Sequence, residues 1–256
     1  RDRGGRTPWR QRRVMATLNT LLAPDLLQPG TQWTLLSDVN GYGRPTGDSL
    51  TTQGRCGRSI RLLQRSSDRL LVQLLEDGYR CWMDLEALIG RAKQLPDWTP
   101  TLLPATEIQR RLPAVLAWSE HAEQQPNHYL WGGTTEPNMD CSGLMQLAFA
   151  SQGIWIPRDA YQQERFCQPV AVAVGALDLL RPGDLIFFGS PRRCTHVGIH
   201  LGGGRYRHSS GQQYGRNGIG VDSLHLSDRH PVASHYRSEL RGAGRVIRCH
   251  DGTTLS

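Results

Sequence analysis

Apolar and polar residues alternate with a period of two between residues 31 and 88, a pattern typical of short β-strands. The predicted strands are Thr31–Leu36, Ser59–Gln64, Arg69–Leu75 and Tyr79–Met83. A polar turn at residues 65–68 joins the middle two, and Gly41–Asp48, with three glycines and one proline, is expected to form a long irregular loop. Short strands linked by turns predict a small all-β barrel over residues 21–94.

A proline-rich stretch follows this β region. Residues 95–106 contain three prolines, which predicts a semi-rigid linker between two domains. Beyond it the apolar spacing predicts two helices, Pro113–Gln124 with its proline in the first turn and Cys141–Gln152. Asp140 is placed to cap the second helix, and Gly153 is placed to end it.

Strand patterns return after residue 184. The expected strands are Leu185–Phe188, Thr195–Leu201 and Arg205–Ser209. Helices followed by strands predict an α+β domain over residues 107–256. The predicted fold class is therefore α+β, with a small all-β barrel in front.

Positive charge is concentrated at the N-terminus. The formal net charge is +7, and the first 13 residues, with six arginines and one aspartate, contribute +5 of it. We interpret residues 1–20 as a basic, disordered arm; Met15 offers an alternative start, so no function is assigned to residues 1–14. Nucleic-acid binding depends mainly on this arm and ranks last among the functions considered.

The chain has no predicted transmembrane segment or signal peptide. Its longest apolar run, Val170–Leu177, has eight residues, whereas a membrane-spanning helix needs about 20. Polar residues interrupt Val14–Leu22, where an export signal would need a continuous apolar stretch. We therefore expect a cytoplasmic protein without a membrane partner.

The six cysteines are widely spaced and contain no C-x-x-C pair. This spacing favours reduced thiols over a disulfide framework or a zinc site, and we expect neither a metal nor another cofactor. Cys141 differs from the others because it begins a predicted helix, where unpaired backbone N–H groups and the helix dipole lower a thiol pKa. The expectation is a thiolate at neutral pH, although a buried packing thiol is the common alternative.

Histidines follow in a predicted hairpin. If three glycines form the turn after Thr195–Leu201, residue 198 faces His208 and residue 196 faces residue 210. His196 and His208 then lie on one face of the sheet, one diagonal step apart. A cysteine peptidase needs such a pair, one imidazole to carry the proton and a second polar group to orient it. His200 shares the face, so geometry alone does not rank the three histidines; we interpret it as a spare polar residue.

Several motifs together carry a resemblance to a known family. They are Tyr129-x-Trp131-Gly132-Gly133, Asp140-Cys141-Ser142-Gly143, Pro157-Arg158-Asp159 with Gln163, residues 181–188, and His196-Val197-Gly198-Ile199 with His208. In this order and spacing, from about residue 105 to 250, the chain resembles the NlpC family of papain-like cell-wall cysteine peptidases. Residues 75–82 resemble a bacterial SH3-like domain. The combination is similar to the γ-D-glutamyl-L-diamino-acid endopeptidases of cyanobacteria and bacilli, which act on peptidoglycan stem peptides with a free N-terminal L-Ala.

The resemblance implies catalytic roles for four residues. Cys141 would be the nucleophile, His196 the general base and acid, and His208 the residue that orients His196. The Tyr129 hydroxyl and the Cys141 backbone N–H would stabilise the tetrahedral intermediate, and each such donor contributes about 3–4 kcal/mol. For Trp131, a role at the site and simple aromatic packing are equally good explanations.

The resemblance also implies how the stem peptide is held. Asp159 would bind the L-Ala ammonium, and Tyr79 would close the site after one N-terminal residue. The remaining candidate substrate-binding residues are Asp140, Ser142, Trp131 and Asp48. Ala160 stands where many relatives have serine, so one substrate hydrogen bond is missing.

Two other functions remain open from the residues. A non-catalytic cell-wall-binding module is disfavoured by the complete Cys141, His196 and His208 set, whereas an acyltransferase using the same thiol is barely separable from a hydrolase. The sequence also leaves open whether the diamino acid is diaminopimelate or lysine, and what the oligomeric state is.

Overall fold

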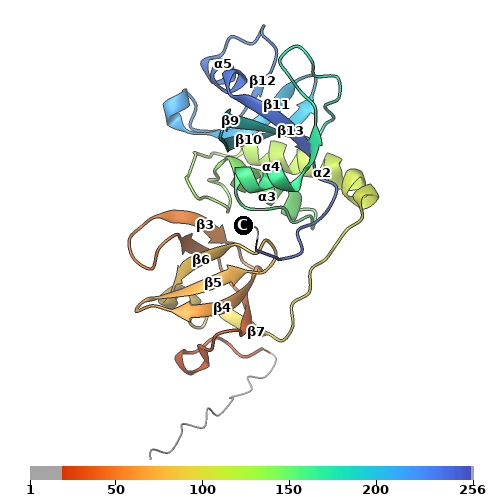
Figure 1. Ribbon diagram of the computed structural model, residues 1–256. Helices are drawn as coiled ribbons and strands as arrows, with labels where there is room; N and C mark the ends of the chain where they lie inside the picture. Colours follow the sequence, from red (N-terminus) through yellow and green to blue (C-terminus); the bar gives the residue numbers. More distant parts are fainter. Residues whose placement is uncertain (1–18, 255–256) are drawn as a thin grey trace, which may run out of the picture.

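The computed structural model describes residues 19–254, which form two domains stacked end to end (Figure 1). Residues 1–18, and with them nearly all of the predicted basic arm, lie outside the described residues. Within residues 19–254 no helix is long and apolar enough to cross a membrane.

The N-terminal domain is a seven-stranded antiparallel sheet with the strand order β3-β2-β6-β5-β4-β1-β7. The strands are β1 (Gln32–Leu35), β2 (Val39–Tyr42), β3 (Leu50–Gly54), β4 (Ser59–Arg65), β5 (Arg69–Leu74), β6 (Arg80–Asp84) and β7 (Ala92–Leu95), with a short helix α1 (Leu85–Leu88). Alternate apolar residues of β4 and β5, such as Ile60, Leu62, Leu70 and Val72, pack in its core, as their period predicts.

Three strands of this domain differ from the sequence prediction. β2, β3 and β7 were not predicted, and Gly41 and Tyr42 belong to β2 rather than to the expected loop. These strands contain few large apolar residues, so their periodicity is weak. The predicted small all-β domain is present, and within the part of the chain that the structure describes no pairing of β3 with β7 closes its sheet.

The C-terminal domain packs helices against a six-stranded antiparallel sheet with the order β12-β11-β10-β9-β13-β8. The strands are β8 (Gln168–Val170), β9 (Leu185–Ser190), β10 (Arg193–Gly202), β11 (Arg205–Ser210), β12 (Gly218–Ser223) and β13 (Leu240–Arg245). The helices are α2 (Ala105–Gln124), α3 (Cys141–Ala150), α4 (Ala160–Phe166) and α5 (Pro231–Ser238). Helices α3 and α4 lie on the side of the sheet that faces the N-terminal domain (Figure 1).

Helix α2 begins eight residues before the predicted start, so Pro113 lies inside it rather than in its first turn. A proline ring inside a helix removes one backbone hydrogen bond, which is why the sequence pattern predicts it in a first turn. Residues buried along its length, including Ile108, Leu112 and Val115, pack in the main core of this domain. That apolar stripe stabilises the helix despite the proline.

Buried polar contacts join the two domains. Gln146 of α3 donates a hydrogen bond to Asp77 Oδ2 at 2.8 Å, and the Arg58 guanidinium lies 4.4 Å from the Trp155 ring centroid. The C-terminal segment passes between the domains (Figure 1), where Gln73 donates to the Gly252 carbonyl at 3.4 Å. These contacts bring a turn of the first domain against the helical face of the second.

Candidate active site

Cys141 is the first residue of α3, and the sequence around it fixes its position. The Asp140 side chain accepts a hydrogen bond from the Gly143 backbone N–H at 2.7 Å, which is the predicted cap. A Cβ on Gly143 would lie 2.1 Å from the Gly133 carbonyl oxygen, so only glycine allows this close approach. Cys141 thereby faces a cavity of about 570 Å³ lined by residues of both domains.

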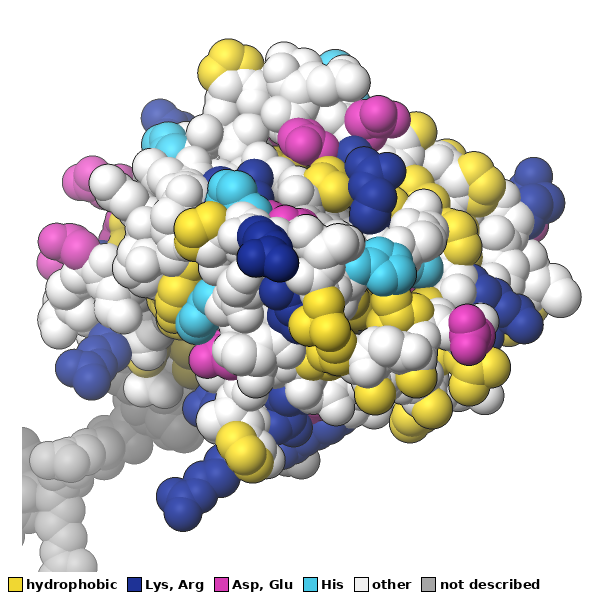
Figure 2. Space-filling view, turned by 90° about the horizontal axis from the view of Figure 1, so that it is seen from above, with side chains coloured by type: hydrophobic (Ala, Val, Ile, Leu, Met, Phe, Trp, Pro, Cys, Tyr) yellow, Lys and Arg dark blue, Asp and Glu magenta, His cyan; other side chains and the backbone are white. Residues whose placement is uncertain are grey.

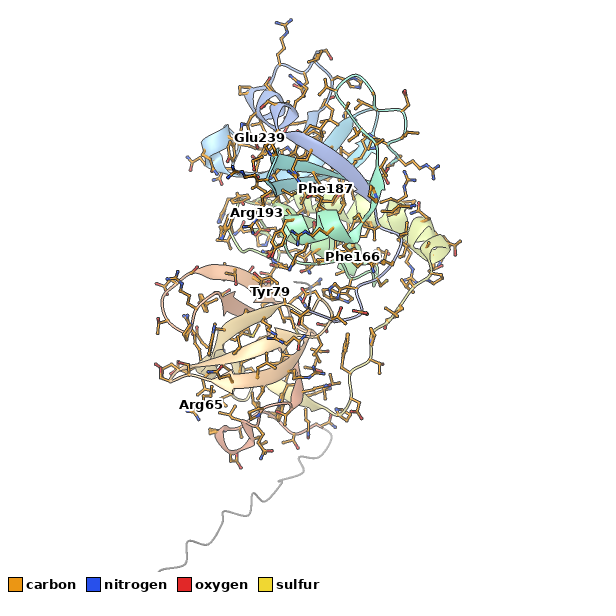
Figure 3. The ribbon with its side chains drawn as sticks, in the orientation of Figure 1. Arg65, Tyr79, Phe166, Phe187, Arg193 and Glu239 are labelled. Atoms are coloured by element: carbon orange, nitrogen blue, oxygen red, sulfur yellow. The ribbon has the colours of Figure 1, made fainter. Side chains whose placement is uncertain are left out.

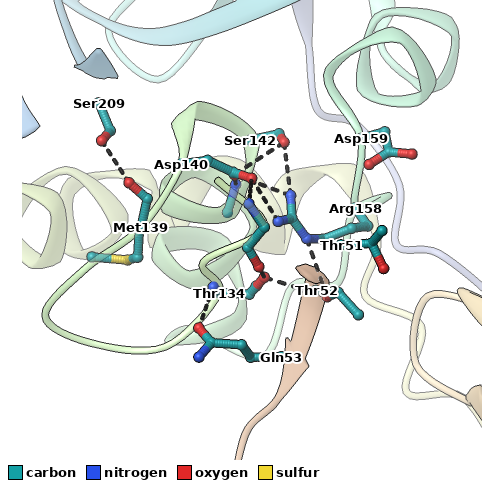
Figure 4. A network of polar contacts seen from close by, with 12 residues as sticks. Thr51, Thr52, Gln53, Thr134, Met139, Asp140, Ser142, Arg158, Asp159 and Ser209 are labelled. Atoms are coloured by element: carbon teal, nitrogen blue, oxygen red, sulfur yellow. Dashed lines mark hydrogen bonds and ion pairs between the residues drawn. The ribbon is translucent and has the colours of Figure 1, made fainter. Parts of the chain in front are cut away.

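A buried ion pair holds the start of α3. Arg158 donates to Asp140 Oδ2 at 2.7 Å and to Ser142 Oγ at 2.8 Å, and its Nε reaches Thr52 Oγ1 of the N-terminal domain at 3.2 Å (Figure 4). The Gly132 backbone N–H donates to the same carboxylate at 2.9 Å. Asp140 and Ser142 line the cavity, yet their polar atoms are already bonded within this network.

Replacing Arg158 with methionine should destabilise the protein strongly. The variant leaves Asp140 buried without its cation, and breaking one side of such a pair costs about 3–5 kcal/mol in the free energy of unfolding. Chemical denaturation measures this loss. Arg110→Met is the matched control, because Arg110 pairs with Glu107 at the surface, where solvent screens the charges, and its loss should be far smaller. Equal losses in the two variants would contradict the structural role of Arg158.

The two candidate histidines meet across the hairpin of β10 and β11. The pairing of Ile199 with Arg207 agrees with the register predicted from the sequence. His196 Nε2 lies 2.8 Å from His208 Nδ1, and both rings are buried. His200 lies farther along β10, where its Nε2 accepts from the Gly204 backbone N–H at 3.1 Å, and it does not line the cavity.

The Asp222 carboxylate binds His208 and thereby determines which ring nitrogens of His208 and His196 carry the protons. His208 Nε2 lies 2.6 Å from Asp222 Oδ2, and Arg216 donates to both Asp222 oxygens at 2.8 Å. Burial opposes ionisation of Asp222, but the His208 hydrogen bond and the Arg216 charge hold the pKa of this carboxyl below its usual value. An ionised carboxylate only accepts, so His208 donates through Nε2 and accepts at Nδ1 from His196 Nε2–H. His196 Nδ1 is then left unprotonated, as a general base requires.

The nucleophile and base form a neutral pair. Burial, followed by the charge of Asp140, raises the pKa of the Cys141 thiol to about 12, against a smaller opposing contribution from hydrogen bonding with the Val197 backbone. Burial and the neighbouring His208 lower the pKa of His196 well below its ordinary value. The expected standing thiolate at neutral pH was therefore wrong, because loss of hydration outweighs the helix N-terminus. Cys141 and His196 line the same cavity, and within residues 19–254 no hydrogen bond joins the Sγ to the imidazole.

The alkylation rate of Cys141 should report this neutral pair. With a thiol pKa near 12, the rate of carboxamidomethylation by iodoacetamide should rise about tenfold per pH unit from about pH 6 to about pH 9. Peptide mass spectrometry measures the rate at each cysteine, with the exposed Cys56 as an internal comparison. A Cys141 rate that is already flat between about pH 6 and about pH 8 would instead require a standing thiolate.

Tyrosines surround the reacting groups. The Tyr236 ring stacks on His196, with centroids 4.0 Å apart and planes 18° from parallel. Burial raises the pKa of Tyr129, with a further contribution from Cys141, so its hydroxyl stays protonated and can donate. Trp131 stands at the cavity rim with 71% of its surface exposed. This exposure does not fit the packing interpretation of Trp131.

Asp159 lines the same cavity, directly before α4. Its backbone N–H donates to Gln162 Oε1 at 3.3 Å, and its side chain accepts from the Gln162 backbone N–H in a capping box. The half-buried carboxylate, drawn in Figure 4, makes no ion pair with any described residue. Burial raises the pKa of this carboxyl. Tyr79, from the turn before β6, lines the same cavity from the N-terminal domain. Asp48 is exposed in its loop and is not among the lining residues, which include Thr51 instead.

Asp222, Arg216 and Tyr236 were not predicted as site residues from the sequence. A signal for Asp222 was present, because His208 pairs with Gly220 in the β11–β12 register and Asp222 follows two residues later on the same face. Recognising Gly218–Ser223 as a strand would have placed this carboxylate beside His208. The glycines in this segment have no side chain to contribute to the alternation of apolar and polar residues, so the strand was not predicted.

Comparisons with known proteins agree with this architecture. A family model described as the NlpC/P60 family matches residues 126–231, and a model described as the bacterial dipeptidyl-peptidase Sh3 domain matches residues 41–88. The bifunctional muramidase/DL-endopeptidase CwlT of Bacillus subtilis (strain 168) is 42% identical over 98 residues, which are 36% of this chain and 28% of that protein. The gamma-D-glutamyl-L-lysine dipeptidyl-peptidase of the same organism is 40% identical over 103 residues, 39% of this chain and 31% of that protein.

This chain therefore covers less than a third of each of these two relatives. The chain also matches the crystal structure of an NlpC/P60 family protein from Bacillus cereus ATCC 10987. The match spans 85% of this chain and 64% of that protein, with 22% sequence identity and a TM-score of 0.45. The two matched family models fall on the two structural domains, in the order that the sequence motifs predict. Residues 126–231 are thus an NlpC/P60 domain, and residues 41–88 before it are a bacterial dipeptidyl-peptidase SH3 domain.

Proposed function

We propose that the protein is a cysteine endopeptidase that hydrolyses the bond between γ-D-Glu and the diamino acid in peptidoglycan stem peptides with a free N-terminal L-Ala. One observation carries the proposal: a single cavity is lined by Cys141 and His196 and also by Tyr79 and Asp159, whose carboxylate makes no ion pair with any described residue. A thiol with its base can break an amide, and a carboxylate without an ion-pair partner can bind an ammonium.

Acylation begins with the neutral pair. Cys141 Sγ attacks the γ-carbonyl carbon of D-Glu while its proton passes to His196 Nδ1, so that a C–S bond forms and the carbonyl oxygen becomes an oxyanion. The Tyr129 hydroxyl and the Cys141 backbone N–H stabilise that oxyanion. The C–N bond then breaks, and the imidazolium returns the proton to the leaving amine of the diamino acid.

Deacylation uses the same base. Water gives a proton to His196 Nδ1 and attacks the thioester carbon, the C–S bond breaks, and His196 reprotonates the departing sulfur. His208 and Asp222 hold the His196 tautomer through both halves of the reaction. All these steps use residues of the chain and water.

The wall formed by Asp159 and Tyr79 selects the substrate. Tyr79 leaves room for one residue beyond D-Glu, and Asp159 complements its ammonium. In an intact cell wall the L-Ala amine is bonded to muramic acid, so it carries no charge and its substituent meets Tyr79. The proposed enzyme therefore trims released peptides. On the face shown in Figure 2, arginines are interspersed with acidic and uncharged side chains, which does not favour a nucleic-acid substrate.

Product analysis tests the proposal. Purified protein incubated with L-Ala-γ-D-Glu-diaminopimelate should release L-Ala-γ-D-Glu and free diaminopimelate, identified by mass spectrometry. A parallel reaction with an added primary amine distinguishes hydrolysis from acyl transfer. Mainly amide product would favour an acyltransferase, and no cleavage of the free-amine peptide would favour a non-catalytic binding module.

A further inference from the structure

Arg193, the first residue of β10, places an unpaired positive charge on the cavity wall. Its guanidinium makes no ion pair or hydrogen bond with any residue between 19 and 254. Other arginines nearby are paired: Arg158 with Asp140, and Arg241 with Glu164. Burial raises the pKa of the Asp159 carboxyl in the same cavity and the charge of Arg193 acts to lower it, but no described carboxylate is ion-paired with the guanidinium. The guanidinium is therefore available to a negatively charged group of the substrate.

The surrounding structure fixes the position of Arg193. Its backbone N–H donates to Ser190 Oγ at 3.2 Å in the β9–β10 turn, and Arg241 binds the Ser190 carbonyl. Its Cζ lies 4.6 Å from the Tyr161 ring centroid, within the range of a cation–π contact. Stacking of this kind holds a guanidinium ready for a planar carboxylate.

The β10 strand carries Arg193 close to the reacting groups. The register of β9 and β10 shifts between Cys194 and His196, and Arg193, Cys194, Thr195 and His196 all line the cavity. Tyr161 follows Asp159 by two residues at the start of α4. Arg193 therefore contacts Tyr161, two residues after the proposed ammonium site at Asp159, and lies on the same strand as the base His196. Figure 3 shows it between Tyr79 and Glu239, which also line the cavity.

The proposed substrate carries a matching negative charge in that stretch. D-Glu is linked through its γ-carboxyl group, so its α-carboxylate is free and lies between the L-Ala ammonium and the scissile bond. We propose that Arg193 binds this α-carboxylate and makes the enzyme selective for D-Glu over its α-amide, D-isoglutamine. This inference rests on the proposed function. Ala160 also lines the described cavity but has no hydroxyl that could donate a hydrogen bond to the α-carboxylate, whereas the Arg193 guanidinium is a charged donor.

Two peptides and three proteins test this role. The peptides are L-Ala-γ-D-Glu-diaminopimelate and the analogue with D-isoglutamine, which differ only by a charged carboxylate against a neutral amide. The proteins are the wild type, Arg193→Gln and Arg192→Gln. Arg192 is also exposed and loses the same charge, but it does not line the cavity.

The wild type should prefer the D-Glu peptide by about 10- to 100-fold in kcat/KM, as expected for one charge-assisted pair. Arg193→Gln should reduce this preference to within about twofold by losing rate on the D-Glu peptide alone, and its unchanged rate on the amide shows that the variant is folded. Arg192→Gln should keep the wild-type preference.

A wild type that cleaves both peptides equally, or an Arg193→Gln variant that keeps the preference, would overturn the role of Arg193 while leaving the proposed function intact. A wild type that cleaves neither peptide would overturn the proposed function itself, and the role of Arg193 with it.

Discussion

Replacing Cys141 with alanine should lower kcat/KM for L-Ala-γ-D-Glu-diaminopimelate by about 10⁴-fold or more, as expected when a nucleophile is lost. Without the sulfur no thioester forms, and His196 has no thiol to deprotonate. The fold should persist, because alanine retains the Cβ at the start of α3 and the Asp140 cap does not involve the Cys141 side chain. The release of diaminopimelate measures the loss.

Cys167→Ala is the matched control. Cys167 is also buried, and burial raises its pKa to about 12, but it lies in the core and not on the cavity wall. This variant should retain kcat/KM within a few-fold under conditions where it is folded. A Cys141→Ala enzyme that keeps substantial activity would contradict the proposed nucleophile.

Asp159→Asn should lower kcat/KM for the free-amine peptide by about 30- to 1,000-fold, equivalent to about 2–4 kcal/mol. Asparagine keeps the shape of the side chain but removes its charge, so the L-Ala ammonium enters a half-buried site without a counterion. N-acetylation of the peptide should produce a loss at least as large in the wild type, because it removes the ammonium charge and places the acetyl group against Tyr79. Because both changes remove the same contact, the acetylated peptide should lose little more in the variant.

Asp48→Asn is the control for this change. Asp48 was a candidate substrate-binding residue, but it is exposed in its loop and does not line the cavity. The expected kcat/KM is within about twofold of the wild type, as for most exposed positions. Additive losses from Asp159→Asn and N-acetylation would show that Asp159 does not bind the ammonium.

Local signals were sufficient for the parts of the site built from neighbouring residues. The Asp140 cap follows from side-chain chemistry at a helix start, and the meeting of His196 with His208 follows from strand alternation and a glycine turn. Each depends on only one helix or one hairpin. The sequence pattern therefore contained most of the information needed to place them.

Contacts between distant segments escaped the sequence analysis. Arg158 reaches Thr52 across the domain boundary, and Asp222 joins His208 from a glycine-rich strand without a clear alternating pattern. The thiolate expectation for Cys141 failed for a related reason. Its burial depends on how both domains cover the cavity, and no local motif reports that loss of hydration.

A crystal structure of the Cys141→Ala variant with uncleaved L-Ala-γ-D-Glu-diaminopimelate would test the central claim most directly. The expected structure has the L-Ala ammonium within hydrogen-bonding distance of Asp159 and the γ-carbonyl carbon of D-Glu above the position of the missing sulfur. A peptide whose ammonium points to solvent, or whose γ-carbonyl lies away from residue 141 and His196, would contradict it.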